Sequence, residues 1–401
     1  MLTDLVLAAN FFCARPAVAT PDPGGHWVGT WGASPQLTET RNLPPPPGLT
    51  SNTLRQIVQV SIGGETLRVR FSNAFGTEPV TMSSVHLARS MGGSTIKTSS
   101  DKVLTFQGKP SVTIPTGKSV VSDPFDFDLA PLSDLAVTID FGAASAAVTG
   151  HPGSRTTSYL QAGDWVTAPD LPNAAKTGHW YILEGIDVLA GNSSGAIITL
   201  GDSITDGRGS GTDRNDRWPD NLARRLQADT NTASIAVLNE GIGGNCVLRG
   251  GLGPTALSRF ERDGLSQNGV CWIIVLEGVN DIGGSHSPEA SASVATNLIA
   301  AYEQIIDQAH ARKLRVYGAT ITPFGGSFYD SPAHEAARRR VNHWIRTSGR
   351  FDAVIDFDAA MRDPQEPSRL LVVADSGDHL HPNEVGYGMM ADSINLKLFE
   401  K

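Results

Sequence analysis

The spacing of apolar residues changes near residue 191, and this change limits the chain to two differently built halves. From about residue 27 to 189, apolar and polar side chains alternate in short runs separated by turn residues, as at residues 135–141. A period of two is typical of strands with one buried face. No amphipathic helical pattern stands out in this half. We therefore expect an all-β sandwich, of jelly-roll type.

Two of these alternating runs are close neighbours in the sequence. Residues 58–62 alternate, Gly63 and Gly64 follow, and the alternation resumes over residues 67–71. A short glycine-containing connection between two such runs favours antiparallel pairing within one sheet. The pattern predicts a hairpin with one apolar face.

The second half alternates apolar runs with helical patterns. The predicted strands are residues 196–200, 234–238, 270–276, 314–321 and 353–357. The predicted helices are residues 219–228, 288–309, 332–345 and 383–399. This order predicts a mostly parallel sheet with helices on both faces, whose site lies at the carboxyl ends of the strands.

Length and charge narrow the classes of protein further. The chain has 401 residues, and single cores stop growing at roughly 250–300 residues. We expect a β-sandwich domain over residues 27–190 and an α/β domain over residues 195–401. The net charge of −9 and the lack of a basic cluster argue against a nucleic-acid partner. The longest apolar stretch, within residues 5–13, is far shorter than the roughly 20 residues that cross a bilayer, so no transmembrane segment is predicted.

Residues 1–19 have features of a secretory signal peptide. A short apolar segment is followed by Ala17, Val18 and Ala19, small residues at the spacing that signal peptidase prefers. No Lys or Arg precedes the segment, and Asp4 lies where positive charge is usual, so a frayed or buried N-terminal segment is the alternative. We expect a secreted, extracellular protein.

The three cysteines leave two alternatives open. If Cys13 is removed with a signal peptide, Cys246 and Cys271 remain as an even pair that can form a disulfide. Buried free thiols are the other interpretation.

A serine near one end of the α/β half and a histidine near the other have the chemistry of nucleophile and base. Ser203 follows the predicted strand 196–200, where its hydroxyl can face a substrate, although serine in such a position is more often a helix cap. Asp378 and His381 are three residues apart, so a carboxylate can orient an imidazole that accepts the serine proton. We expect His379 to point away from this pair, toward packing or substrate contact.

Two glycine- and asparagine-containing segments follow other predicted strands. Residues 239–245 come after the strand 234–238, and residues 278–281 come after the strand 270–276. A glycine lets a backbone N–H approach a substrate closely, and an amide side chain donates without bringing a charge, as an oxyanion hole requires. Ordinary turns are the alternative for both segments.

Metal and phosphate sites fit the sequence less well. A metal site at Asp378, His379 and His381 needs a further ligand, which the sequence does not offer at a recognisable spacing. Neither residues 207–209 nor residues 241–244 lead into the Gly-Lys-Ser/Thr ending of a phosphate-binding loop. No metal or cofactor is predicted.

Taken in order, the four segments resemble the SGNH (GDSL) hydrolase family, in which Ser, Gly, Asn and His come from successive blocks. The resemblance covers residues 196–401 and implies an SGNH-type, flavodoxin-like α/β fold. Residues 29–34 and 68–73 look like the β-sandwich that precedes the hydrolase domain in a secreted fungal and bacterial subgroup. The implied site residues are Ser203 as nucleophile, His381 as base, Asp378 as its partner, and Ser203, Gly244 and Asn280 as oxyanion-hole donors.

The second block has a competing choice, Gly241. Gly244 is preferred because it is the final glycine of the Asn-x-Gly-x-x-Gly pattern that starts at Asn239.

The resemblance implies a serine esterase that hydrolyses carboxylic esters through an acyl-enzyme. Together with the expected secretion and the β-sandwich, it favours acetyl or other short acyl groups on a plant or microbial polysaccharide. The alternatives are an esterase of lipase or lysophospholipase type and a noncatalytic carbohydrate-binding protein on a hydrolase-like fold. Trp27, Trp31, Trp165 and Trp180 could stack on sugars, but core positions are favoured for most of them.

Overall fold

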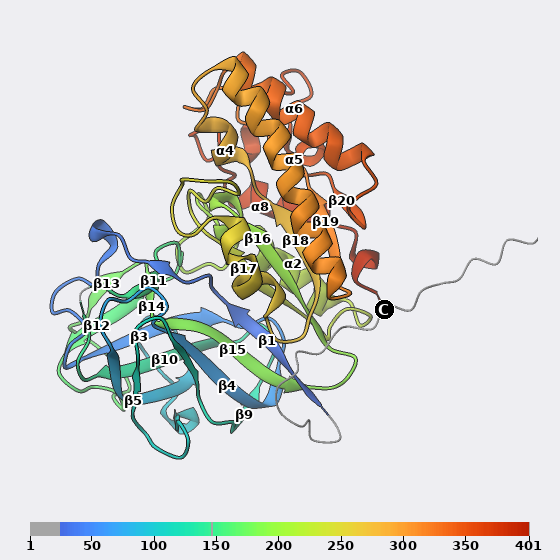
Figure 1. The fold of residues 1–401 in the computed structure, drawn as a ribbon. Helices are drawn as coiled ribbons and strands as arrows, with labels where there is room; N and C mark the ends of the chain where they lie inside the picture. Colours follow the sequence, from blue (N-terminus) through green and yellow to red (C-terminus); the bar gives the residue numbers. More distant parts are fainter. Residues whose placement is uncertain (1–24, 146, 401) are drawn as a thin grey trace, which may run out of the picture.

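The N-terminal half of the chain is all-β, as predicted (Figure 1). The computed structural model describes residues 25–145 and 147–400; the predicted signal peptide at residues 1–19 lies outside the described residues. Two sheets pack face to face around one apolar core, which contains Leu67 and Val69 from one sheet and Val137 and Ile139 from the other. The jelly-roll topology of this sandwich stays a prediction.

Within residues 25–145 and 147–190, the strands form three sheets. The first holds β1 (His26–Gly32), β4 (Gly64–Ser72), β8 (Ser119–Val121), β9 (Phe125–Leu129) and β15 (Leu183–Ala190). The second holds β3 (Asn52–Gln59), β5 (Val80–Arg89), β6 (Lys102–Val103), β7 (Val112–Ile114), β10 (Asp134–Phe141), β12 (Ser158–Ala162) and β13 (Ala175–Thr177). The small third sheet holds β2 (Gln36–Leu37), β11 (Thr149–His151) and β14 (Trp180–Tyr181).

The predicted hairpin over residues 58–71 is wrong. β3 pairs with β10 and β12, whereas β4 pairs with β15, β8 and β9, so the two strands lie in different sheets. The connection is held elsewhere, because Ser61 Oγ donates to Thr30 O over 2.8 Å and accepts from Val237 N–H over 3.1 Å. Alternation specifies which face of a strand is buried, but it does not specify the neighbouring strand.

Two of the four tryptophans considered above belong to the sandwich core. Trp31 and Trp180 are buried and meet edge to face, with 4.9 Å between ring centroids. Trp27 is half-buried under the guanidinium of Arg68, and Trp165 is exposed.

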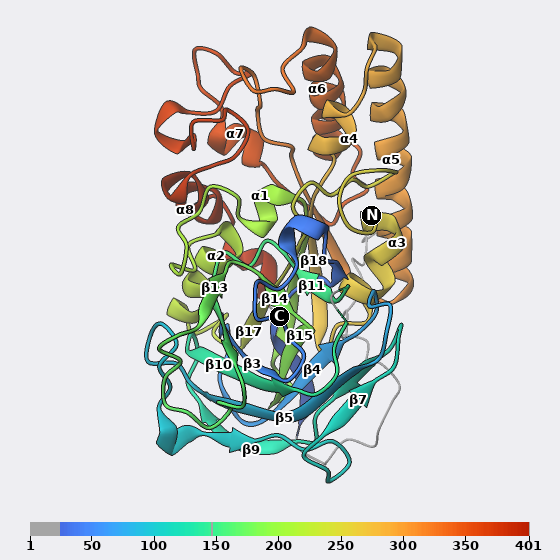
Figure 2. The ribbon, with the colours of Figure 1, turned by 90° about the vertical axis from the view of Figure 1, so that its left-hand side faces the viewer.

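The C-terminal half contains the predicted parallel sheet with helices on both faces. Its strands are β16 (Gly195–Gly201), β17 (Ile235–Gly241), β18 (Val270–Leu276), β19 (Arg315–Ala319) and β20 (Ala353–Ile355), in the spatial order β17-β16-β18-β19-β20. The longer helices are α2 (Trp218–Ala228), α5 (Pro288–Ala311), α6 (Pro332–Thr347) and α8 (Glu384–Asp392). Figure 2 shows α2 and α8 on one side of the strands and α3 and α5 on the other.

Short helical turns connect these elements. They are α1 (Ser203–Asp206), α3 (Ala256–Arg259), the π-helical turn η3 (Phe260–Leu265), α4 (Val279–Gly283), α7 (Phe357–Met361) and the 3₁₀ turns η4 (Val372–Ala374) and η5 (Leu396–Phe399). The last predicted helix, residues 383–399, is therefore interrupted. α8 ends at Asp392, and the Asn395 side chain caps the new turn η5 by accepting from Lys397 N–H.

The strand order fixes where a site can form. The chain leaves β16 for β17 on one side and later returns to β18 on the other side, so the connections diverge at the carboxyl end of β16. Sheets of this kind bind ligands where the direction of winding reverses. The segments after β16, β17 and β18 are the ones that carry Ser203, Gly244 and Asn280.

The sandwich packs directly on the edge of the parallel sheet. β1 lies beside β17, and a parallel bridge joins Ala33 to Asn239. Gly29 N–H donates to Asn268 O over 2.9 Å. β15 ends at Ala190 and β16 begins at Gly195, and we retain residues 27–190 and 195–401 as the proposed domain boundaries.

Candidate active site

Ser203 begins the short helix α1, directly beyond the carboxyl end of β16. Asp202 rather than Ser203 caps this helix, since its carboxylate accepts from Ile204 N–H over 2.9 Å. The cap interpretation of Ser203 is therefore wrong, and its hydroxyl is not engaged by the helix end. Within the described residues, the backbone N–H of Ser203 has no hydrogen-bond partner.

The structure brings Ser203, His381 and Asp378 into one hydrogen-bonded line. Ser203 Oγ lies 2.8 Å from His381 Nε2, and His381 Nδ1 lies 2.7 Å from Asp378 Oδ2. The other carboxylate oxygen of Asp378 accepts from the backbone N–H of His381 over 2.8 Å. Because the carboxylate accepts a hydrogen bond from Nδ1–H, the proton stays on Nδ1, and Nε2 is left to accept from the serine hydroxyl.

The surroundings set the protonation of this pair. Burial acts to raise the pKa of Asp378, but hydrogen bonds from the backbone and ring of His381 lower it to about 2. Burial lowers the pKa of His381 below its ordinary value; Asp378 acts against this shift, and Arg208 and Arg155 add to it. At neutral pH the imidazole is therefore neutral and the carboxylate is ionised, as a general base and its orienting group require.

His379 is directed to a different carboxylate. Its Nδ1 lies 2.5 Å from Asp375 Oδ2, and its side chain is 54% exposed. The two imidazoles of this loop thus contact different acidic residues, Asp375 for His379 and Asp378 for His381.

The geometry separates the two glycines that compete for the second block. Gly241 N–H already donates to Asn239 Oδ1 over 3.0 Å. Gly244 adopts the left-handed conformation, with φ of 72°, which turns the chain beyond β17. In the part of the chain that the structure describes, its N–H has no partner, so Gly244 is the available donor.

The amide of Asn280 is held at both ends. Its Nδ2 donates to Asn245 O over 2.8 Å, and its Oδ1 accepts from Tyr329 O–H over 3.1 Å. An amide nitrogen has two protons, so the second proton of Nδ2 is left for a ligand. Tyr329 was not predicted, because only the folded chain brings it to Asn280.

The carboxylate of Asp281 joins the segment after β17 to the segment after β18. Asp281 accepts from Val247 N–H over 2.8 Å and from Leu248 N–H over 2.9 Å. The loop that carries Gly244 is therefore tied to α4, which carries Asn280. Asp281 lies beside Asn280 in the sequence, but its role as a loop anchor has no sequence signature.

The sandwich also contacts the helix that begins with Ser203. His151 Nε2 lies 2.9 Å from Asp206 Oδ1, and His151 Nδ1 lies 3.0 Å from Ser34 O. Both side chains of the His151–Asp206 pair are buried, and the imidazole stacks on Trp180. No sequence pattern pointed to this contact, which links residues 55 positions apart.

Cys246 is a buried free thiol. The bridge between Cys246 and Cys271, one of the two alternatives left open by the sequence, is therefore not formed. Burial raises the pKa of Cys246 to about 12, so the thiolate is absent near neutral pH.

Residues 199–389 match the model of the GDSL-like lipase/acylhydrolase family. The C-terminal half, which contains the parallel sheet and the grouped Ser203, His381 and Asp378, is therefore similar to GDSL-like acylhydrolases over this range. It follows an all-β region in the chain. No curated protein shows significant similarity to the chain.

Several solved structures are similar to about half of the chain. A lipase/acylhydrolase from Enterococcus faecalis is 20% identical, with 52% of this chain and 97% of that chain covered and a TM-score of 0.39. A mutant of an acetylxylan esterase from Geobacillus stearothermophilus is 20% identical, with 50% and 92% covered and a TM-score of 0.38. A GDSL-like lipase from Bacteroides thetaiotaomicron is 16% identical, with 51% and 87% covered and a TM-score of 0.37.

Across the described ranges, the helices are too short or too polar to cross a bilayer.

Proposed function

We propose that this protein is a serine esterase that hydrolyses carboxylic esters through an acyl-enzyme at Ser203. One observation carries the proposal: Ser203 Oγ, the His381 ring and the Asp378 carboxylate form a continuous line, with contacts of 2.8 and 2.7 Å. The family match supports the ester class of substrate.

Acylation starts with the transfer of the Ser203 hydroxyl proton to His381 Nε2. The serine oxygen attacks the ester carbonyl carbon, and the carbonyl oxygen becomes negatively charged. The N–H groups of Ser203 and Gly244 and the free amide proton of Asn280 are the proposed donors to this oxygen. Protonated His381 then gives its proton to the departing alcohol, which leaves an acyl group on Ser203.

Deacylation repeats the same steps with water. His381 takes a proton from water, and the resulting hydroxide attacks the acyl carbon. As the tetrahedral intermediate collapses, His381 returns the proton to Ser203 Oγ, and the carboxylic acid is released. Asp378 keeps the imidazole oriented and stabilises its charged form in both halves of the reaction.

Acetyl or other short acyl groups on carbohydrate are the proposed substrates, and the protein is proposed to act outside the cell. The polar rim beside His381 supports a hydroxyl-rich alcohol, because the side chains of Arg208 and His379 there are 63% and 54% exposed. A lipid ester is the second candidate. It is favoured by Val372 and Val373, which are 85% and 60% exposed on the turn that leads into the His381 loop.

A panel of esters separates these candidates. We expect purified protein to hydrolyse acetylated xylo-oligosaccharides and short p-nitrophenyl esters with a kcat/KM at least about tenfold above that for long-chain esters. Val372→Ser with Val373→Ser should leave the short-chain rates unchanged. Preferential hydrolysis of long acyl chains, lost in this double variant, would instead support the lipid candidate.

The pH profile tests the role of His381. The base acts in its neutral form, and burial lowers its pKa, so kcat/KM should fall on acidification with a midpoint below the ordinary histidine value of about 6.5. Removing a nearby positive charge raises a histidine pKa, so Arg208→Gln should move this midpoint toward neutral pH. A rate that stays flat through the acid range contradicts the assignment.

A further inference from the structure

The guanidinium of Arg259 is buried where three strands of the parallel sheet end. It donates to Gly201 O over 3.0 Å and to Glu240 O over 2.6 Å, and it lies 3.4 Å from Glu277 Oε1. Its side chain is fully buried. Gly201 is the last residue of β16, Glu240 is the last but one of β17, and Glu277 directly follows β18. One side chain therefore joins the ends of the three strands that lead into the proposed site.

The same guanidinium leads to the oxyanion-hole amide. Arg259 Nε donates to Asn245 Oδ1 over 3.1 Å, and Asn245 Nδ2 donates to the carbonyls of Leu252 and Pro254, each over 2.8 Å. These bonds fix the Asn245 residue, whose backbone carbonyl accepts from Asn280 Nδ2. Arg259 thus acts on Asn280 through a single intervening residue.

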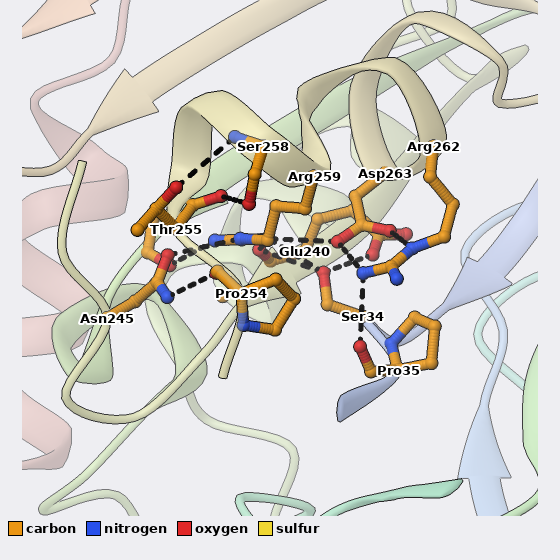
Figure 3. A network of polar contacts seen from close by, with 12 residues as sticks. Ser34, Pro35, Glu240, Asn245, Pro254, Thr255, Ser258, Arg259, Arg262 and Asp263 are labelled. Carbon is orange, nitrogen blue, oxygen red and sulfur yellow. Dashed lines mark hydrogen bonds and ion pairs between the residues drawn. The ribbon is translucent and has the colours of Figure 1, made fainter. Parts of the chain in front are cut away.

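The β-sandwich contributes one member of this network (Figure 3). Ser34 lies two residues beyond β1, and its hydroxyl accepts from Arg259 Nη1 over 2.8 Å and donates to Glu240 Oε2 over 2.7 Å. The hydroxyl therefore connects Arg259 to the end of β17 from outside the parallel sheet. Ser34 and Glu240 are both buried.

Only an arginine suits this position. Its neighbours include Asp263 at 3.3 Å and Glu277 at 3.4 Å, two acceptors within reach of the guanidinium. Its three nitrogens contact acceptors on several sides, which a planar guanidinium with five N–H groups can satisfy and an ammonium cannot. The winding changes from α-helical to π-helical directly after Arg259, and π-helical turns are frequent at functional sites.

We propose that Arg259 is a positioning residue for the oxyanion hole. We also propose that Ser34, a residue of the β-sandwich, helps to hold the Arg259 guanidinium in place. This inference rests on the proposed esterase function. Arg259 holds the ends of β16, β17 and β18 in register and keeps Asn245 where it orients the Asn280 amide. Ser34 keeps the guanidinium in place.

Two variants and a matched control test the proposal. Arg259→Lys keeps the charge but loses the planar donor set, and Ser34→Ala removes only the contact from the sandwich. Arg262→Lys is the control, because Arg262 follows on the next turn and contacts Asp263 and Pro35 O, but makes no bond to Gly201, Asn245 or Glu277. All rates are expressed per active site titrated with a fluorophosphonate, so that a smaller folded fraction does not lower kcat.

We expect Arg259→Lys to lower kcat by about 10- to 100-fold with little change in KM, since small misplacements of catalytic groups have effects of this size. Ser34→Ala should lower kcat by about 2- to 10-fold, a smaller loss, because the guanidinium keeps its other hydrogen bonds to Gly201, Glu240 and Asn245. Arg262→Lys should stay near wild type. Equal kcat values for all three variants and the wild type would overturn the inference.

A double-mutant cycle separates positioning from a general structural role. In an Asn280→Ala background the amide is gone, so Arg259→Lys and Ser34→Ala should have little further effect on kcat. Fully additive losses would overturn the inference. If Arg259→Lys yields no folded protein, the Ser34→Ala cycle decides alone. A failure of the proposed esterase function gives a different result from a failure of this inference, because ester turnover would then persist in Ser203→Ala.

Discussion

Replacing Ser203 with alanine is expected to lower kcat/KM for ester hydrolysis by about four orders of magnitude or more. The change removes the attacking oxygen and leaves His381 without the proton that it accepts. The fold should persist, because the carboxylate of Asp202 caps α1 and the Ser203 hydroxyl does not. Rates on p-nitrophenyl acetate, together with the melting temperature, measure both effects.

A serine-directed fluorophosphonate gives an independent readout of the same variant. The wild-type protein should be labelled at Ser203, and Ser203→Ala should not be labelled. Ser210→Ala is the matched control, since Ser210 lies on the same connection and its hydroxyl bonds to Gly207 O rather than to His381. Wild-type turnover by purified Ser203→Ala would refute Ser203 as the nucleophile.

Removal of the Asn280 amide is expected to lower kcat by about 100- to 1,000-fold, with a smaller change in KM. In the proposed mechanism the amide proton meets negative charge that develops only in the transition state, so its loss should affect the chemical step more than substrate binding. Steady-state kinetics of Asn280→Ala on a short ester measure the two parameters separately.

A graded variant distinguishes amide orientation from amide loss. Tyr329→Phe removes the donor to Asn280 Oδ1 but leaves the amide and its bond to Asn245 in place. The decrease in kcat should therefore be smaller than that of Asn280→Ala. An unchanged kcat in Asn280→Ala would exclude this side chain from the oxyanion hole.

The fold class could be predicted because it follows from the local spacing of apolar residues along the sequence. The continuous apolar run at residues 270–276 coincides with β18, and Ser287 followed by Pro288 marks the start of α5, where the serine side chain accepts from Ala290 N–H. The partner of each strand was harder to predict. Residues 58–62 and 67–71 have the same alternation, yet β3 and β4 belong to different sheets, because their connection is bound to β1 and β17.

The candidate site likewise has residues that could be predicted from the sequence and residues that could not. Ser203, Gly244 and Asn280 lie in segments that follow β16, β17 and β18, and His381 lies in the loop before α8, from which it contacts Ser203. No sequence motif marks the residues that support the site. Arg259, for example, lies in the short helix α3. Tyr329, Ser34 and His151 also reach the site only through tertiary contacts, which single-sequence periodicity does not encode.

The packing of β1 on β17 has a consequence for the isolated α/β half. β17 is a terminal strand of the parallel sheet, and its outward Val237 N–H bonds to Ser61 Oγ, while Asn239 forms a bridge with Ala33. A chain cut at residue 191 would present these backbone groups as an open strand border, a template on which other chains can add. By covering the edge of β17, the N-terminal half should reduce aggregation through this strand.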